Sequence, residues 1–161
     1  LALTLAACSS TGPETAGTSV EDRGAGVATV TAGSASGSGI AALTDPNNIL
    51  SKRSVFFDFD SYVIKQEARA LVEAHARFLV QNPQMRMLIQ GNTDERGSRE
   101  YNLALGQKRA DAIKKMLVLL GAREEQVESV SLGEEKPKNE GQNEAAWAEN
   151  RRGDMLYSGE F

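Results

Sequence analysis

The segment Gly91–Arg109, with the sequence GNTDERGSREYNLALGQKR, joins a short apolar run to a long helical pattern. Residues 86–90 before it predict a strand, because apolar side chains dominate a short run. The polar residues 94–98 predict a turn, and the apolar spacing from about residue 99 to 120 predicts a helix that ends at Gly121. A strand, a turn and a long helix in direct succession are typical of an α/β fold.

The flanking sequence extends the same pattern in both directions. Aromatic and β-branched residues predict a strand over 54–60, and apolar residues at three- and four-residue steps predict a helix over 65–81. Alternation predicts a third strand over 127–132, followed by a short helix over 143–149 and a last strand over 152–157. Gly153 and Asp154 weaken the start of that last strand. The order predicts an α/β sandwich of βαβαβαβ type, with helices packed on a small sheet.

The first residues predict a lipid anchor. Residues 1–7 are apolar or small, as at the end of a secretory signal peptide, and Leu5-Ala6-Ala7-Cys8 resembles a bacterial lipobox. This motif predicts cleavage before Cys8 and acylation of its thiol and new amino group. Ser9 and Ser10 resemble the residues that follow the cysteine in outer-membrane lipoproteins. No other run approaches the ~20 apolar residues that a transmembrane helix needs.

Residues 8–47 are rich in Ser, Thr, Gly and Ala, and their few large apolar side chains show no period. Such a segment cannot bury enough surface to offset its chain entropy, so we expect a disordered, lipid-anchored flexible linker. The turn signal Asp45-Pro46-Asn47-Asn48 places the start of the globular domain near residue 48. The sequence therefore predicts three parts: residues 1–7, 8–47 and 48–161.

The formal charge of −4 and the pI near 5.1 give no reason to expect a nucleic-acid partner. The first 48 residues hold one cation, Arg23, and four acids, a balance of −3 that leaves about −1 for the remainder. A site in the globular part must therefore work through local charge.

The opening segment contains neither cysteine nor histidine, so it is poorly suited to thiol, Ser-His or metal chemistry. Asn102, Leu105 and Arg109 share one helix face. Asp94 precedes the helix, where a negative charge is favoured. Asp94 could hold an ammonium group while Arg109 binds a carboxylate. Alternatively, Asp94 caps the helix or the turn and Arg109 pairs with an internal acid.

The remaining acidic, histidine and tryptophan side chains could also have catalytic, metal-binding or structural roles. Asp58, Asp60, Asp94 and Glu95 could divide acid and base catalysis or hold a divalent ion, but acids beside turns are common for local reasons. We therefore expect no enzyme activity, no metal site and no cofactor. We also expect His75 to be a buried structural residue and Trp147 to anchor its short helix to the core.

Several separated motifs together resemble one family. They are Phe56-Phe57-Asp58-Phe59-Asp60-Ser61, Gly91-Asn92-Thr93-Asp94-Glu95-Arg96-Gly97, Tyr101-Asn102 with Leu105, Arg109-Ala110, Gly133-Glu134 with Pro137, and Asn150-Arg151-Arg152. In order and spacing they are similar to the peptidoglycan-associated lipoproteins, which carry an OmpA-like C-terminal domain. The similarity runs from about Asn48 to Tyr157, and the lipobox and linker upstream also fit.

The resemblance implies a mixed four-stranded sheet with helices on one face, and non-covalent binding of meso-diaminopimelate in the peptidoglycan stem peptide. In that family pattern Asp94 would meet the ligand's ammonium and Arg109 its carboxylate. The other residues implied at the site are Thr93, Asn102, Leu105, Phe59, Asp60 and, nearby, Arg151.

The resemblance also implies a cellular role. The chain would be anchored in the outer membrane of a Gram-negative bacterium, with its domain facing the periplasm and tethering that membrane to the cell wall. A second partner would be TolB, the periplasmic β-propeller protein of the Tol system, with a role in envelope integrity and cell division. The alternatives are a module that mainly binds the Tol partner, and a hydrolase acting on the wall.

Overall fold

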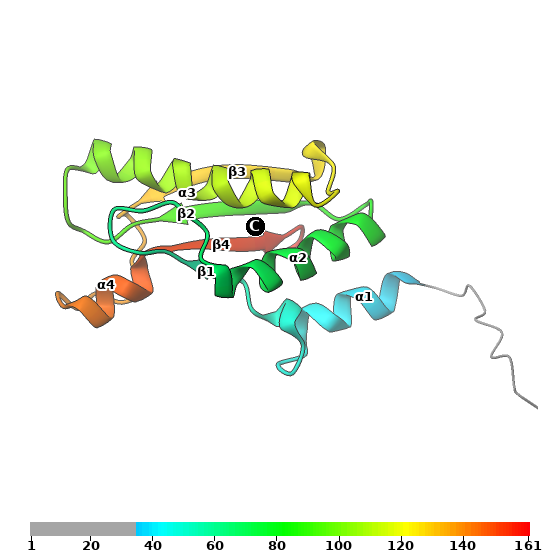
Figure 1. Cartoon of the computed structure of the whole chain (residues 1–161). Coiled ribbons are helices and arrows are strands. Elements are labelled where there is room, and N and C mark those ends of the chain that lie inside the picture. The colour runs from blue at the N-terminus through cyan, green and yellow to red at the C-terminus, as the bar shows by residue number, and fades with distance from the viewer. Residues whose placement is uncertain (1–34) are drawn as a thin grey trace, which may run out of the picture. The chain divides into compact units, whose positions relative to one another are not determined.

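The structure, a computed structural model, describes residues 35–161, with side chains from Ile40 onward (Figure 1). The predicted signal-peptide remnant, the lipidation site at Cys8 and most of the predicted linker lie outside the described residues. The elements in order are α1 (Ala35–Thr44), η1 (Ile49–Ser51), β1 (Ser54–Phe56), α2 (Gln66–Gln81), β2 (Met87–Asn92), α3 (Arg99–Leu119), η2 (Glu124–Gln126), β3 (Val127–Gly133), α4 (Glu144–Asn150) and β4 (Arg152–Tyr157). None of the helices in this part of the chain is long and apolar enough to cross a membrane.

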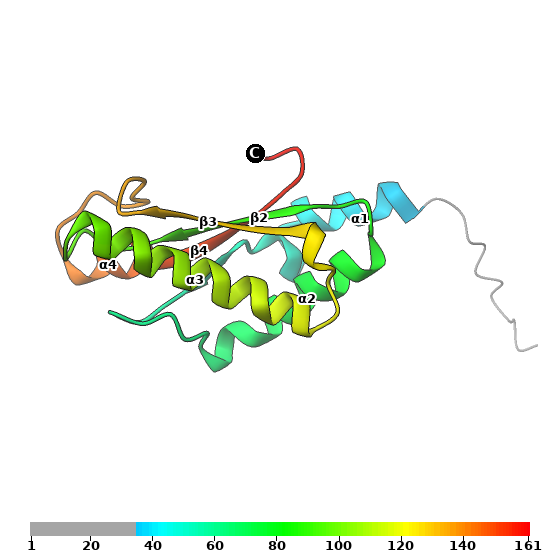
Figure 2. The ribbon, with the colours of Figure 1, turned by 90° about the horizontal axis from the view of Figure 1, so that it is seen from above.

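The strands form one mixed sheet in the order β1-β4-β2-β3. β2 and β3 are parallel, whereas β4 is antiparallel to both β1 and β2. The two long helices, α2 and α3, lie on the same face of this sheet (Figure 2). The predicted mixed four-stranded sheet with helices on one face is thus confirmed.

The core fills the space between the sheet and these two helices. The apolar stripe of α2 contributes Val72, Ala76, Phe78 and Leu79, and α3 contributes Ala110, Ile113 and Leu117, all buried. They pack against Val55, Met87, Ile89, Val127, Met155 and Tyr157 from the strands. Burying each such side chain stabilises the fold by about 1.5–3 kcal/mol, so the periodicity that predicts these elements also explains why they pack together.

His75 is a structural residue, as expected. Its Nε2 lies 2.8 Å from the carbonyl oxygen of Lys52, and its Nδ1 lies 2.8 Å from the hydroxyl of Tyr157. Because a carbonyl can only accept, Nε2 carries the proton and Nδ1 accepts from Tyr157. Burial lowers the pKa of His75 to about 4, so the ring is neutral at neutral pH.

Helix α3 approaches β2 through two glycines. A Cβ added to Gly91 would lie 1.8 Å from the carbonyl oxygen of Gly106, and one added to Gly106 would lie 2.3 Å from the Oγ of Ser131. Only glycine allows backbones to come this close. The contact fixes the height of α3 above the sheet next to the end of β2.

Strand β4 begins at Arg152 in spite of Gly153 and Asp154. The methyl group of Ile113 occupies the space that a side chain at residue 153 would need, since an added Cβ would lie 2.4 Å from Cδ1 of Ile113. The Asp154 carboxylate accepts hydrogen bonds from the hydroxyl of Ser54 at 2.6 Å and from Nε of Arg152 at 2.8 Å. Both residues are therefore accommodated by tertiary contacts that a local pattern does not show.

The structure corrects two boundaries. β1 ends at Phe56, not at residue 60, because the chain leaves the sheet and turns at residues 59–60. The expected linker extends to residue 47, but α1 occupies residues 35–44, and Leu43 is buried within the core cluster. The carbonyl of Leu43 also accepts a hydrogen bond from Arg53 at 3.1 Å. The last residues of the predicted linker therefore pack against the domain.

Candidate functional site

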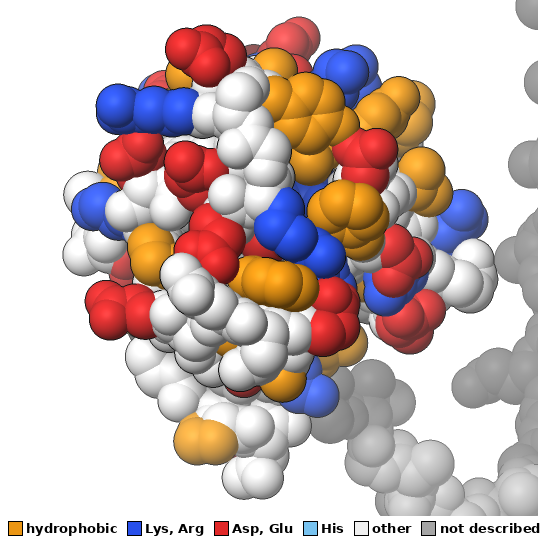
Figure 3. Space-filling model, turned by 90° about the vertical axis from the view of Figure 1, so that its left-hand side faces the viewer, with side chains coloured by type: hydrophobic (Ala, Val, Ile, Leu, Met, Phe, Trp, Pro, Cys, Tyr) orange, Lys and Arg blue, Asp and Glu red, His pale blue; other side chains and the backbone are white. Residues whose placement is uncertain are grey.

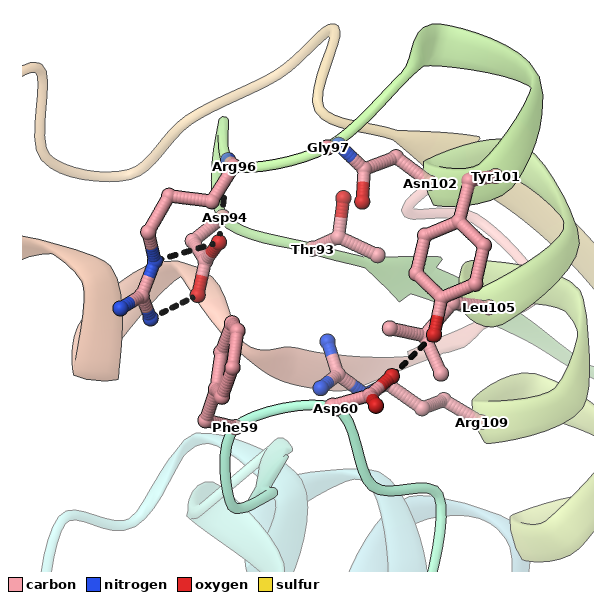
Figure 4. Close-up of a pocket in the computed structure, with 10 residues that line it drawn as sticks. All are labelled: Phe59, Asp60, Thr93, Asp94, Arg96, Gly97, Tyr101, Asn102, Leu105 and Arg109. Atoms are coloured by element: carbon pink, nitrogen blue, oxygen red, sulfur yellow. Dashed lines mark hydrogen bonds and ion pairs between the residues drawn. The ribbon is translucent and has the colours of Figure 1, made fainter.

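A pocket of about 220 Å³ lies where the loop after β1, the loop after β2 and the first turns of α3 meet (Figure 4). Its lining residues are Phe59, Asp60, Thr93, Asp94, Arg96, Gly97, Tyr101, Asn102, Leu105 and Arg109. All the predicted ligand residues except Arg151 line this pocket. Arg151 does not line it but contacts the carboxylate of Asp94. Three lining residues, Arg96, Gly97 and Tyr101, were not predicted as site residues from the sequence.

Helix α3 begins at Ser98, which determines which of its side chains face the pocket. The Ser98 hydroxyl accepts a hydrogen bond from the backbone N–H of Tyr101 at 3.2 Å and so caps the helix. Asn102, Leu105 and Arg109 then fall on one face, which confirms the prediction from their spacing. Because Ser98 is the cap, Asp94 does not cap α3.

Arg109 is fully buried in the wall of this pocket. Its Nε donates to the carbonyl of Ser61 at 2.8 Å, while Nη1 and Nη2 donate to the carbonyls of Asn92 at 2.8 Å and Asp58 at 3.1 Å. It forms no salt bridge with any of the described residues. Two of the five N–H groups of a guanidinium remain available. The interpretation that Arg109 pairs with an internal acid is therefore wrong.

Burial lowers the pKa of Arg109 to about 10, against the opposing effect of the Asp94 charge. The guanidinium therefore stays protonated at neutral pH. A buried cation held only by neutral carbonyls is strongly stabilised by an anion. The pocket can thus accept a carboxylate at Arg109, where two N–H groups could bind it.

Asp94, which is also buried, already has cationic partners. One oxygen accepts from the backbone N–H and Nε of Arg96 at 3.1 and 3.2 Å, and the other accepts from Nη2 of Arg96 at 2.7 Å and Nη1 of Arg151 at 3.3 Å. Burial alone would raise the pKa of Asp94, but these hydrogen bonds and charges lower it overall. Asp94 therefore stabilises the turn after β2, which agrees with the alternative that it caps the turn. An incoming ammonium would share the Asp94 carboxylate with Arg96.

Arg96 is held in place by aromatic rings as well as by Asp94. Its guanidinium carbon lies 4.1 Å from the ring centre of Phe59 and 4.1 Å from that of Trp147. The Trp147 indole N–H also donates to Glu95 at 3.1 Å. The expectation that Trp147 anchors α4 to the core is wrong, because Trp147 is only half-buried and the buried residues of that helix are Ala146 and Asn150. Trp147 instead closes the outer side of the Arg96 stack.

Three further polar groups complete the pocket. Asp60 has a positive φ of 51°, an uncommon conformation that Asp tolerates, and its carboxylate accepts a hydrogen bond from the Tyr101 hydroxyl. This hydrogen bond raises the pKa of Tyr101. The Thr93 hydroxyl is buried and has no hydrogen-bond partner among the described residues. A buried hydroxyl without a partner is costly, so a further hydrogen-bonding group near Thr93 would stabilise this part of the pocket.

Charge at this end of the molecule is mixed on a short length scale, with acidic, basic and hydrophobic side chains interspersed (Figure 3). The acids considered for catalysis or metal binding each have separate partners: Asp58 pairs with Lys65 at 2.6 Å and Glu95 binds Trp147. In the part of the chain that the structure covers, no group of acidic, histidine or cysteine side chains is arranged to hold a metal ion. The site is thus a small, two-ended pocket of local positive and negative charge.

Comparisons with known proteins identify relatives of this chain. The sequence model of the OmpA family matches residues 56–151, which include all the pocket residues. The peptidoglycan-associated lipoprotein of Pasteurella multocida is 49% identical over 104 residues, covering 65% of this chain and 69% of that protein. The one from Legionella pneumophila is 37% identical over 162 residues, covering 97% of this chain and 89% of the relative.

A solved structure is also similar. The crystal structure of the peptidoglycan-associated lipoprotein from Burkholderia pseudomallei superimposes with a TM-score of 0.71 at 58% sequence identity, covering 72% of this chain and 98% of that chain. Sequence and fold together lead to one assignment. The chain belongs to the OmpA family and, within it, to the peptidoglycan-associated lipoproteins.

Proposed function

We propose that the domain binds peptidoglycan non-covalently, through the meso-diaminopimelate of its stem peptide, and performs no catalysis. The observation that carries this proposal is the state of Arg109: buried, charged, held by three carbonyls and lacking a carboxylate partner among the described residues. Relatives that are named as peptidoglycan-associated lipoproteins supply the ligand class.

Diaminopimelate fits the two-ended pocket because the far end of its side chain carries both an ammonium and a carboxylate. The carboxylate would bind the free N–H groups of Arg109. The ammonium would lie toward Asp94, and the Thr93 hydroxyl, buried without a partner, would meet one of the two. Leu105 and Phe59 would contact the methylene chain, while Asp60 and Asn102 would form the polar sides of the pocket.

Isothermal titration calorimetry with two stem peptides tests this proposal. One peptide contains meso-diaminopimelate, and the other contains lysine, which keeps the ammonium but lacks the side-chain carboxylate. We expect the wild-type chain to bind the first peptide at least about 30-fold more tightly, which is about 2 kcal/mol. Arg109→Lys should remove most of that difference, because a lysine cannot make the bidentate contact.

Lys115→Met is the matched control, because Lys115 is an exposed cation of the same helix outside the pocket. Thermal unfolding of each variant separates loss of binding from loss of fold. Equal affinity of the wild-type chain for both peptides would contradict the assignment of the carboxylate to Arg109. Release of soluble muropeptides from purified sacculi would contradict a purely binding role.

We also propose that the chain is anchored in the outer membrane through an acylated Cys8, so that the domain faces the periplasm of a Gram-negative bacterium and tethers the membrane to the wall. The lipobox sequence and the lipoprotein relatives support this part. Metabolic labelling with palmitate in cells that make the full precursor should label the wild-type protein and not Cys8→Ser. Unlabelled wild-type protein in the inner- or outer-membrane fractions would overturn the anchor.

The same proposal places the protein in the Tol system, with TolB as its partner and a role in envelope integrity and cell division. Support comes from family membership. If the partner's surface overlaps the pocket, a diaminopimelate stem peptide should compete with TolB in a pull-down. Simultaneous binding of peptide and TolB would exclude an overlapping surface.

A further inference from the structure

Strand β1 forms an edge of the sheet, and part of its backbone is unpaired. The backbone N–H of Phe57 donates to the backbone carbonyl of Arg151 at 2.9 Å, and that of Met155 donates to the carbonyl of Arg53 at 2.8 Å. Residues 53, 55 and 57 therefore face β4, so the main-chain groups of Ser54 and Phe56 face away from it. These groups have no hydrogen bond to any described residue. An open edge of this kind can accept a further strand.

A groove runs beside this edge, between the η1–β1 segment and the first turns of α2. It has a volume of about 690 Å³, and both Ser54 and Phe56 line it. Its apolar part includes Ile49, which is 40% exposed, and Phe56, which is 41% exposed. Ala68 and Leu71 of α2 line the opposite wall. None of its residues belongs to the pocket around Arg109, so it is a separate surface.

The charge of the groove is mainly positive. Its lining includes the cations Lys52, Arg53, Lys65 and Lys138, and the single acid Glu67. Arg53 and Lys65 already pair with Glu160 and Asp58, at 3.2 and 2.6 Å. Lys52 and Lys138 have no carboxylate partner within the described part of the chain. Both are exposed at the groove and favour a negatively charged occupant.

We infer that this groove binds an extended acidic peptide segment, which adds to β1 as a further strand. Main-chain hydrogen bonds to Ser54 and Phe56 would hold the segment in register, and alternate side chains would lie on the apolar wall. Because β1 is short, about five residues of the segment are enough to span the edge at ~3.3 Å per residue. Carboxylates of the segment would then lie close to Lys52 and Lys138.

The test uses isotope-labelled full chain and two capped hexapeptides, one alternating glutamate with valine and the other alternating lysine with valine. Titration at low salt, followed by amide resonances, should shift Ser54 and Phe56 with the glutamate peptide and leave them unchanged with the lysine peptide. Raising the salt to 300 mM should weaken the glutamate peptide several-fold, because the cations are exposed.

Variants separate main-chain pairing from charge. Phe56→Pro removes the N–H that the segment would need and should abolish the shifts, whereas Phe56→Ala keeps that N–H and should retain binding at reduced affinity. Reversing two charges with Lys52→Glu and Lys138→Glu should weaken binding about tenfold. Lys115→Glu carries the same kind of charge change outside the groove and should have no effect.

Three results would overturn the inference. The first is the absence of shifts at Ser54 and Phe56 at millimolar glutamate peptide. The second is equal binding of the two peptides, or binding unchanged by the double charge reversal. The third is a shift of the same resonances with protein concentration alone, which would mean that the edge pairs with a second copy. If Phe56→Pro fails to fold, the charge-reversed variant still decides the outcome.

Discussion

Arg96 is a half-buried cation that pairs with Asp94 at the pocket, and its guanidinium lies between the rings of Phe59 and Trp147. A guanidinium that donates to both oxygens of a carboxylate and stacks on two rings is well ordered. It therefore sets both the charge and the orientation that Asp94 offers to a ligand. Because Arg96 follows Asp94 by only two residues, its pairing depends on the turn geometry, which local sequence patterns do not describe.

Arg96→Ala should raise the pKa of Asp94. Burial, which raises this pKa, remains in the variant, while the side-chain hydrogen bonds and charge of Arg96, which lower it, are lost. NMR titration of the Asp94 carboxyl carbon would measure the shift. Arg99→Ala is the control, because Arg99 pairs with Glu135 and not with Asp94. An unchanged pKa in Arg96→Ala would show that Arg151 alone sets the charge of Asp94.

His75 predicts a loss of stability in mild acid. Its pKa is about 4 in the folded state, below the ordinary 6.5, because burial disfavours the charged form. The unfolded chain therefore binds a proton between these values that the folded chain does not. The stability that depends on neutral His75 is fully present above pH 6.5. The free energy of unfolding then decreases as the pH falls toward 4, by about 2 kcal/mol at pH 5.

Urea unfolding at pH 7.5 and pH 5 measures this effect. His75 is the only histidine of the chain, so His75→Gln should flatten the dependence over this range even though it lowers stability at every pH. Asp94 acts in a more acidic range, because the stability from its lowered pKa is present above its ordinary value of 3.8 and is lost as the pH falls further. A pH dependence unchanged by His75→Gln would contradict the role of this histidine.

At the scale of helices and strands, the contact of α3 with β2 through Gly91 and Gly106 determines whether the pocket residues meet. Gly106→Ala would place a Cβ 2.3 Å from Ser131 and 2.8 Å from the carbonyl of Gly91, so α3 must move outward. We expect a loss of about 2 kcal/mol in the free energy of unfolding, typical of overpacking, although alanine is the better helix former. Affinity for the diaminopimelate peptide should fall with it, because α3 carries Arg109.

Ala104→Gly is the control for helix propensity, since Ala104 is exposed on the same helix. It should cost about 1 kcal/mol in stability and leave peptide affinity unchanged. Chemical denaturation and titration of both variants measure the two effects. A Gly106→Ala variant that is more stable than the wild-type chain would show that the helix and strand are not in tight contact.

The elements predicted from the sequence are those whose side-chain period is regular. The helix expected over 65–81 is α2 at Gln66–Gln81, and the helix expected from 99 to about 120 is α3 at Arg99–Leu119. α1 was missed because its sequence, ASGSGIAALT, has no apolar stripe and Leu43 is its buried core residue. The end of β1 was misplaced because the chain leaves the sheet to form the pocket loop, where Asp60 takes its positive φ.

The part of the site that lies on a helix could be predicted from the sequence. The spacing of Asn102, Leu105 and Arg109 places them on one face without any tertiary information. Phe59 and Asp60 were expected at the site only through the family resemblance, and the structure brings them to the pocket. The roles of Tyr101 and Trp147 were missed, because their contacts with Asp60 and Arg96 join helices to loops that are far apart in the sequence.

At the scale of the whole molecule, the ordered domain begins before residue 48. Leu43→Ala should lower the free energy of unfolding by about 2–3 kcal/mol, because Leu43 is buried in the core cluster. Ile40→Ala is the matched control in the same helix, since Ile40 is 54% exposed, and it should have little effect. Equal costs for the two variants, measured by chemical denaturation, would mean that α1 does not pack on the domain in solution.

The direction of β1 has a mechanical consequence for the proposed link between the outer membrane and the cell wall. The chain enters β1 at Ser54 and leaves it toward Phe59 and Asp60, so the strand runs toward the pocket. Tension applied upstream of Ser54 and resisted by a ligand beside Arg109 would act along the strand. The β1–β4 hydrogen bonds, which lie across that direction, would then be loaded together in shear and would not open one at a time. The hydrogen bonds between β1 and β4 would therefore share a force along β1, which is the direction in which a short strand resists force best.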